Sequence, residues 1–359
     1  MPIKRSQYLL SSFSVAMALV LTGCGGGGSS TAAVSTISVS GVASAGPLAG
    51  ADVKVYDALD PKGVTGTPLN LQPVVTDANG NYTVEVPATY ATHPLIVQIT
   101  GNATTTMTDE VLGNIAAGNL NGFTLNAVDP AASTTVPAAP ITVSTNVTPI
   151  TNVTYNIVAS QIGQSDVDDA IKQANSVVVQ TLTGGQNPLT TNPTTDPQMV
   201  IALATISNLA NTAACSGEAT AADKIKCSVT ATAGMFTPMA AGYDAAAPTN
   251  VSFSGAGATL AGNLQTAAGT VAANATHTAL TLEERTAANA SNPLATIATG
   301  PVVIPPAATL AGVDKAKAFF TELRTKILPY YNPDGTGYLN TRAAALDTET
   351  RAMAVDGLL

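Results

Sequence analysis

The sequence is poor in the residues that build most active sites, with no tryptophan, two histidines, three cysteines and only 10% charged residues. Aromatic residues make up 4% of the chain, fewer than the stacking surface of a dedicated sugar-binding module requires. The 23 acidic residues outnumber the 14 basic ones, which gives a net charge of −9. Nucleic acid and anionic lipid both need a basic face, so both are excluded as partners.

The two histidines, His93 and His277, lie far apart in sequence and in different predicted domains. A serine-histidine-aspartate site needs a histidine beside a nucleophile, and the chain has no Gly-x-Ser-x-Gly motif. We therefore expect both histidines to be solvated surface residues. Nucleotide loops, haem-attachment motifs and zinc-protease motifs are also absent. The sequence predicts no catalytic residue, no cofactor and no enzymatic activity.

Paired acids give little sign of acid/base chemistry. Glu283 and Glu284 are adjacent, and adjacent residues on a helix point about 100° apart. They cannot flank one glycosidic bond, so we expect a solvated first helical turn.

Two segments have oxygen donors in calcium-like spacing. Asp77, Asn79 and Asn81 alternate, but turn chemistry explains all three. The better candidate is the segment 332–340, yet Ala343 stands where a calcium loop places a bidentate glutamate. We expect two turns and no metal.

The N-terminus has a short basic head, then an apolar run, then a motif of small residues before a cysteine. Lys4 and Arg5 precede an apolar run from Phe13 to Leu21 that is too short for a stable membrane anchor. The sequence Leu-Thr-Gly-Cys at 21–24 resembles a lipobox, which implies removal of residues 1–23 as a signal peptide and acylation of Cys24. The alternative is an ordinary secretory signal with a chance cysteine.

Residues 24–35 are rich in glycine and serine and predict a flexible tether. Gly25, rather than aspartate, follows the lipidated cysteine, which resembles the default sorting pattern for the outer membrane. We expect an outer-membrane lipoprotein, and the sequence leaves open whether its body faces the periplasm or the cell surface.

The remaining cysteines, Cys215 and Cys227, predict one disulfide, because an even pair in an exported chain is normally oxidised. Zinc binding is the alternative, but two thiols without a nearby histidine do not complete a zinc site.

Residues 36–128 alternate between apolar and polar side chains, as β-strands do. Ala51, Val53 and Val55 share one strand face. The segment 74–87 predicts a hairpin around Asn79-Gly80. In its second strand, Tyr82, Val84 and Val86 point to one side. Further strands are expected at 94–99 and 124–128.

The segments Gly46-Pro47-Leu48-Ala49-Gly50-Ala51 and Thr76-Asp77 through Gly80-Asn81-Tyr82 resemble the carboxypeptidase regulatory-like family. Members of that family form transthyretin-like β-sandwiches, related to immunoglobulin-type folds. The resemblance covers about a quarter of the chain and implies a structural or binding module without catalytic residues.

Residues 129–145, rich in proline, alanine and threonine, predict an extended linker. Helical periodicity follows at 167–182, 199–213 and 316–327, and less regularly at 256–279, and a last helix is expected at 340–353. The sequence thus predicts a multidomain chain, in which an antiparallel β-sandwich is followed by an Ala-rich all-α domain at 146–359.

Together these features predict a non-catalytic, lipid-anchored protein of the cell envelope. Its folded part would display a binding or structural module for adhesion, envelope assembly or polymer capture. The expected partners are the membrane, through the anchor, and a protein or polysaccharide ligand. An extracellular hydrolase and a periplasmic docking partner of an envelope machine remain as alternatives. The order of sandwich, linker and Ala-rich helices resembles that of a loosely defined group of bacterial outer-surface lipoproteins whose longer members carry further domains. A truncated part of a longer protein is therefore a further alternative.

Overall fold

The computed structural model describes residues 35–240, 249–251, 253, 255–273, 280–297 and 302–304, and these belong to one compact unit. Several predictions lie outside the described residues: the signal peptide, the lipidated Cys24, His277, the calcium candidate at 332–340 and the helices at 316–327 and 340–353. Nearly all of the tether also lies outside them.

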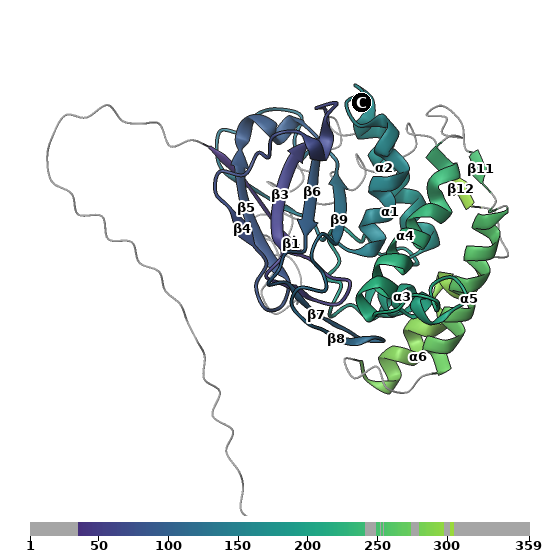
Figure 1. Cartoon of the computed structure of the whole chain (residues 1–359). Coiled ribbons are helices and arrows are strands. Elements are labelled where there is room, and N and C mark those ends of the chain that lie inside the picture. The colour runs from purple at the N-terminus through teal and green to yellow at the C-terminus, as the bar shows by residue number, and fades with distance from the viewer. Residues whose placement is uncertain are drawn as a thin grey trace, which may run out of the picture. The chain divides into compact units, whose positions relative to one another are not determined.

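Three sheets form the N-terminal half (Figure 1). The first has the order β10-β1-β5, with bounds Ile141–Ser144, Thr36–Val42 and Asn81–Pro87. The second has the order β4-β3-β6-β9, with bounds Val74–Val75, Asp52–Asp57, Leu95–Thr100 and Thr124–Asp129. The third has the order β2-β7-β8, with bounds Leu48–Ala49, Thr106–Asp109 and Gly113–Ile115. All pairs are antiparallel except β1 with β10.

The first two sheets share a core built from the alternating apolar positions that the sequence predicts. Val53 and Val55 of β3 are buried, as are Tyr82, Val84 and Val86 of β5. Side chains two residues apart point to the same face of a strand, so each strand contributes one apolar row to this core.

The predicted hairpin at 74–87 is wrong in its pairing. Asn79-Gly80 does form the expected tight turn, with Gly80 at a φ of +79° and the Asp77 carboxylate accepting the backbone N–H groups of Asn79 and Asn81. However, β4 pairs with β3 and β5 pairs with β1. The turn therefore carries the chain from one sheet to the other.

The predicted linker at 129–145 also requires correction. Asp129 is the last residue of β9, and β10 pairs in parallel with β1 over four residues. The intervening loop is fixed as well, because the Ala131 N–H donates to the Asp168 carboxylate at 2.8 Å. This segment is thus part of the packed structure.

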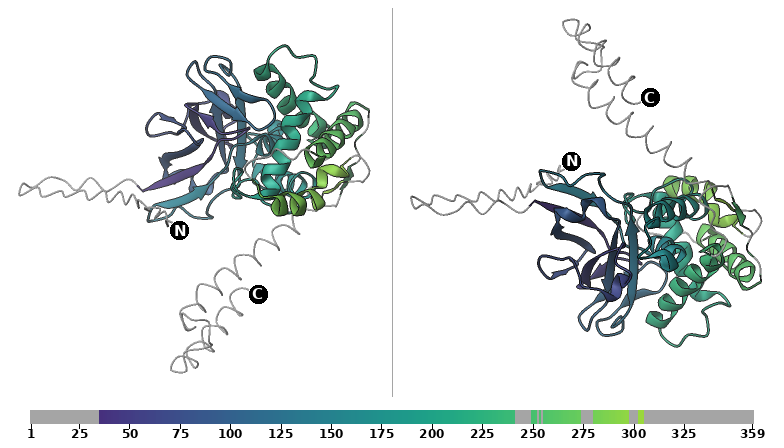
Figure 2. Two further views of the ribbon diagram at one scale, coloured as in Figure 1. Left: turned by 90° about the horizontal axis from the view of Figure 1, so that it is seen from below. Right: turned by 90° about the horizontal axis from the view of Figure 1, so that it is seen from above.

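The C-terminal half contains six α-helices among the described residues, gathered on one side of the sheets (Figure 2). Their bounds are α1 Pro149–Val158, α2 Val167–Thr181, α3 Pro197–Asn208, α4 Ala221–Ala240, α5 Ala256–Ala273 and α6 Leu282–Ala290. A short strand pair, β11 Thr249–Val251 with β12 Val302–Ile304, accompanies them. The helices α2, α3 and α5 correspond to predicted ones, whereas no specific helix is predicted over α1 and α4.

The helical half does not form a separate core, because it packs on the second face of the β3-β6-β9 sheet. Tyr56, Ile96 and Val128 are cross-strand neighbours on that face and belong to the same buried cluster as Ile150 and Val153 of α1. The division into two separately packed domains is corrected accordingly: one buried cluster includes both this sheet face and residues of α1 to α5.

Candidate functional site

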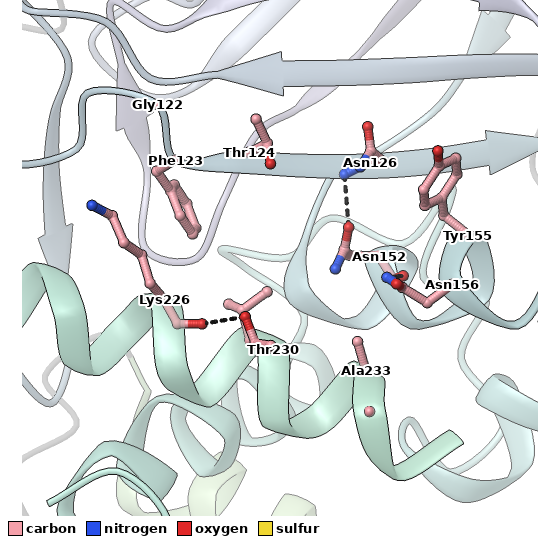
Figure 3. A pocket seen from close by; sticks show the side chains of 12 residues that line it. Gly122, Phe123, Thr124, Asn126, Asn152, Tyr155, Asn156, Lys226, Thr230 and Ala233 are labelled. Atoms are coloured by element: carbon pink, nitrogen blue, oxygen red, sulfur yellow. Dashed lines mark hydrogen bonds between the residues drawn. The ribbon is translucent and has the colours of Figure 1, made fainter. Parts of the chain in front are cut away.

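A polar cleft lies where β9, α1 and α4 meet (Figure 3). We call it the β9–α4 cleft. Its volume is about 430 Å³, within the range of about 300–1,000 Å³ typical of small-ligand sites. Its lining residues are Gly122, Phe123, Thr124, Asn126, Asn152, Tyr155, Asn156, Lys226, Val229, Thr230, Ala233 and Gly234.

One wall of the cleft is the free edge of β9. The Gly101 N–H donates to the Phe123 carbonyl, so the polar backbone groups of Phe123 face the β6 side of the sheet. Backbone direction alternates along a strand, so Thr124 and Asn126 direct their N–H and C=O groups outward. The Asn126 N–H is met by the Asn152 side-chain oxygen at 3.0 Å. The N–H and C=O of Thr124 have no partner within the described residues.

The second wall is α1, which is fixed firmly at its start. Thr148 and Thr151 form a reciprocal capping box, and Pro149 occupies the first turn, where it costs no hydrogen bond. Asn152 and Asn156 follow four residues apart, so both lie on the same helix face. This face is turned toward β9.

The three asparagines of the cleft each use one end of the carboxamide to hold the structure. The Asn126 oxygen accepts from Gln98 at 3.1 Å, the Asn152 oxygen accepts from the β9 backbone, and the Asn156 nitrogen donates to the Asn152 carbonyl at 2.7 Å. Within the described part of the chain, the other end of each carboxamide has no protein partner. The cleft therefore presents two amide donors and one amide acceptor whose positions are already fixed.

The third wall is α4, which carries Lys226 and Thr230. The helix begins after Thr220, whose hydroxyl accepts the Asp223 N–H at 3.1 Å. The sulfurs of Cys215 and Cys227 are 1.98 Å apart, the distance of a disulfide, in agreement with the predicted pair. This link ties the α4 turn that carries Lys226 to the segment following α3.

Lys226 and Tyr155 stand at opposite ends of the cleft (Figure 3). The Lys226 ammonium donates a long hydrogen bond of 3.4 Å to the Asn119 carbonyl. Burial raises the pKa of the Tyr155 hydroxyl, which therefore stays protonated and can donate or accept. The cleft can therefore form neutral hydrogen bonds with a ligand along its length, and it carries one positive charge at its end.

None of these twelve residues is among those singled out from the sequence. Asparagine is a poor helix former, so Asn152 and Asn156 spaced four apart on one helix are the local signal that sequence reasoning overlooked. The positions on β9 and α4 carry no comparable signal, because they meet only through the fold.

His93 is placed differently from the prediction of a solvated surface histidine. Its Nδ1 lies 2.8 Å from an Asp57 carboxylate oxygen, and its ring packs edge-on against Tyr90. The side chain is 34% exposed. His93 is thus half-buried and paired with a carboxylate, and no described serine, threonine or cysteine is hydrogen-bonded to it.

The remaining acid candidates behave as expected from turn and cap chemistry. The Asp77 carboxylate caps its own turn, and hydrogen bonds from Asn81 lower its pKa. Glu284 closes a capping box with Thr281 at the start of α6, and this bonding lowers its pKa; Glu283 lies beside it in the first turn. Among the described residues, no group of three metal-ligating side chains converges.

Two acids went unnoticed in the sequence: Asp109, which is buried, and Asp129, which is half-buried. Asp109, 3% exposed, accepts the Ser207 hydroxyl of α3 and the N–H groups of Val111 and Leu112, while burial raises its pKa. Burial also raises the pKa of Asp129 to about 7. Both are at strand ends, where local sequence does not reveal burial.

No described helix combines the length and the hydropathy of a membrane span. Comparison of the chain with protein-family models, with curated proteins and with solved structures finds no match.

Proposed function

We propose that this chain is a lipid-anchored, non-catalytic binding protein of the bacterial outer membrane, serving adhesion, envelope assembly or polymer capture. In this proposal residues 1–23 are removed as a signal peptide, Cys24 carries the lipid, and the glycine-rich tether holds the folded body away from the membrane. The sheets of the N-terminal half are then a transthyretin-like module, on which the helical half completes the binding site.

The observation that carries the proposal is the hydrogen-bonding pattern of the β9–α4 cleft. Asn126, Asn152 and Asn156 are each held at one end and open at the other. Groups that are fixed before the ligand arrives lose little conformational freedom on binding, which favours affinity. Such an arrangement suits recognition of a hydroxyl- or amide-bearing polymer.

A direct test is co-sedimentation of the full-length protein, purified in detergent, with insoluble cell-wall polysaccharide from the producing bacterium. The double substitution Thr124→Val and Asn156→Ala removes the Thr124 hydroxyl, from a residue that lines the cleft, and the open carboxamide oxygen of Asn156, without touching the bond that covers β9. Two lost hydrogen bonds of about 1 kcal/mol each weaken binding roughly tenfold or more. Gln180→Ala, an exposed carboxamide of α2 outside the cleft, is the matched control and is expected to bind like the wild type. Equal binding by all three proteins contradicts the proposal.

The His93–Asp57 pair favours one second candidate, an extracellular hydrolase, because these are two of the three groups of a hydrolytic triad. The same sedimentation assay separates the two functions if the supernatant is analysed for released fragments. Fragment release that His93→Ala lowers by about a hundredfold or more, the scale of a lost general base, supports the hydrolase. Retention without release supports the binding protein.

A further inference from the structure

We propose that the β9–α4 cleft binds a sugar unit bearing a single carboxylate, with Lys226 pairing with that carboxylate. This inference rests on the proposed function and names its ligand class. Lys226 is the only lysine, arginine, aspartate, glutamate or histidine among the lining residues. Within the described part of the chain, no carboxylate lies within 4 Å of its ammonium group.

The surroundings of Lys226 limit how much negative charge the ligand carries. Glu218 and Asp223 line a shallow depression next to the cleft, and Lys226 lines both the depression and the cleft. The whole chain carries a net charge of −9. A densely charged polymer is repelled by this field, whereas one carboxylate placed at the lysine gains a local partner. The charge pattern therefore fits a sparsely acidic chain.

The neutral part of the cleft favours a saccharide over an extended peptide. A peptide that adds to a sheet edge needs several consecutive open backbone groups. In this cleft only Thr124 offers both an open N–H and an open C=O, because Asn152 already occupies the Asn126 N–H. Sugar hydroxyls both donate and accept, so they match the open ends of Asn126 and Asn156 alike.

The ion pair and the hydrogen bonds would form in different parts of the cleft. Lys226 lies at one end of the cleft and the asparagines extend from its middle toward Tyr155 (Figure 3). The low aromatic content of the chain argues against stacking as the main source of affinity, and Phe123 is nearly fully buried. Recognition here relies on hydrogen bonds and one ion pair, with the disulfide at Cys227 holding the lysine-bearing turn in place.

The test is a glycan array that carries acidic saccharides beside their matched methyl esters, together with a set of peptides. The probe is the full-length protein in detergent. We expect the wild type to prefer acids over their esters by about fivefold, the scale of a solvent-accessible ion pair. Lys226→Gln is expected to abolish this preference. Lys224→Gln, which removes a nearby lysine outside the cleft, is expected to keep it.

The outcomes distinguish this inference from the function on which it rests. In one outcome, acids and esters bind equally well and the double substitution Thr124→Val with Asn156→Ala abolishes both. This result leaves the binding function in place and overturns the carboxylate assignment. An acid preference that survives Lys226→Gln overturns it too. Binding to peptides alone overturns the saccharide assignment, and absence of binding to any probe overturns both proposals.

Discussion

Replacing Asp129 by asparagine should stabilise the protein in mild alkali and leave its stability unchanged in acid. Asp129 ends β9 and accepts the Thr145 hydroxyl at 2.6 Å. Burial is the main cause that raises its pKa from 3.8 to about 7, and the nearby Asp168 of α2 adds to the shift. Asp168 is itself paired with Lys172 at 2.8 Å, and Tyr82 faces Asp129 from β5.

The sign follows from proton binding in the two states. The folded protein holds the Asp129 proton up to about pH 7, whereas the unfolded chain releases it near the ordinary pKa of 3.8. Between these values the folded state binds more protons, so the free energy of unfolding falls as pH rises. The stabilisation present below pH 4 is lost as the pH passes 7.

The full shift corresponds to roughly 4 kcal/mol. Asp129 keeps part of its surface in solvent, so we expect about half of this, roughly 2 kcal/mol. Asparagine does not titrate and still accepts the Thr145 hydroxyl. Urea denaturation followed by circular dichroism should therefore give equal stabilities at pH 4 and a more stable Asp129→Asn protein at pH 8. A difference between variant and wild type that is the same at every pH refutes the reasoning.

Three further predictions concern the fold and the anchor. Gly80→Ala should lower the free energy of unfolding by at least about 2 kcal/mol more than Gly113→Ala does. Both glycines have a positive φ, but a Cβ at Gly80 lies 2.4 Å from the Ala43 carbonyl oxygen, whereas a Cβ at Gly113 meets no atom within 4 Å. Thermal unfolding of the two variants measures the difference. Replacing Cys215 and Cys227 together by serine should lower the free energy of unfolding by up to about 3 kcal/mol, and equal stability of wild type with and without reductant contradicts this. Cys24→Ala should give an uncut precursor or an unlipidated soluble protein, and an unmodified Cys24 in membrane-associated wild type, seen by mass spectrometry, opposes the anchor.

The alternation of apolar residues in β3 and β5 was enough to predict those strands and their buried faces. It did not predict the pairing partners. Asn79-Gly80 determines where the chain reverses, but the Thr76 hydroxyl bonds to the Leu48 carbonyl and accepts the Ala51 N–H, which directs the preceding strand toward β3. Strand pairing depends on such long-range contacts, and a local turn motif carries no information about them.

The run from Leu95 to Val97 held an overlooked signal about the domain arrangement. A strand buried on one face alternates, whereas these three consecutive residues are apolar and all buried. Such a run indicates burial on both faces and therefore a second layer against the sheet. That layer is α1 with α2, which is why a separate helical domain was the wrong expectation.

The cleft was beyond the reach of sequence reasoning for a different reason. Its polar residues come from three segments that are distant along the chain, and each looks like an ordinary solvated position by itself. Only the packing of α1 and α4 around the β9 edge brings Thr124, Asn152 and Lys226 to one place. The disulfide was easier to predict, because two cysteines of an exported chain leave few alternatives.

The most direct measurement of the central claim is amide chemical-shift mapping of the labelled full-length protein in detergent during titration with soluble fragments of envelope polysaccharide. The account predicts shifts concentrated at residues 122–126, 152–156 and 226–234, including the side-chain amides of Asn126 and Asn152. Shifts concentrated around His93 and Asp57, or none at saturating fragment, contradict it.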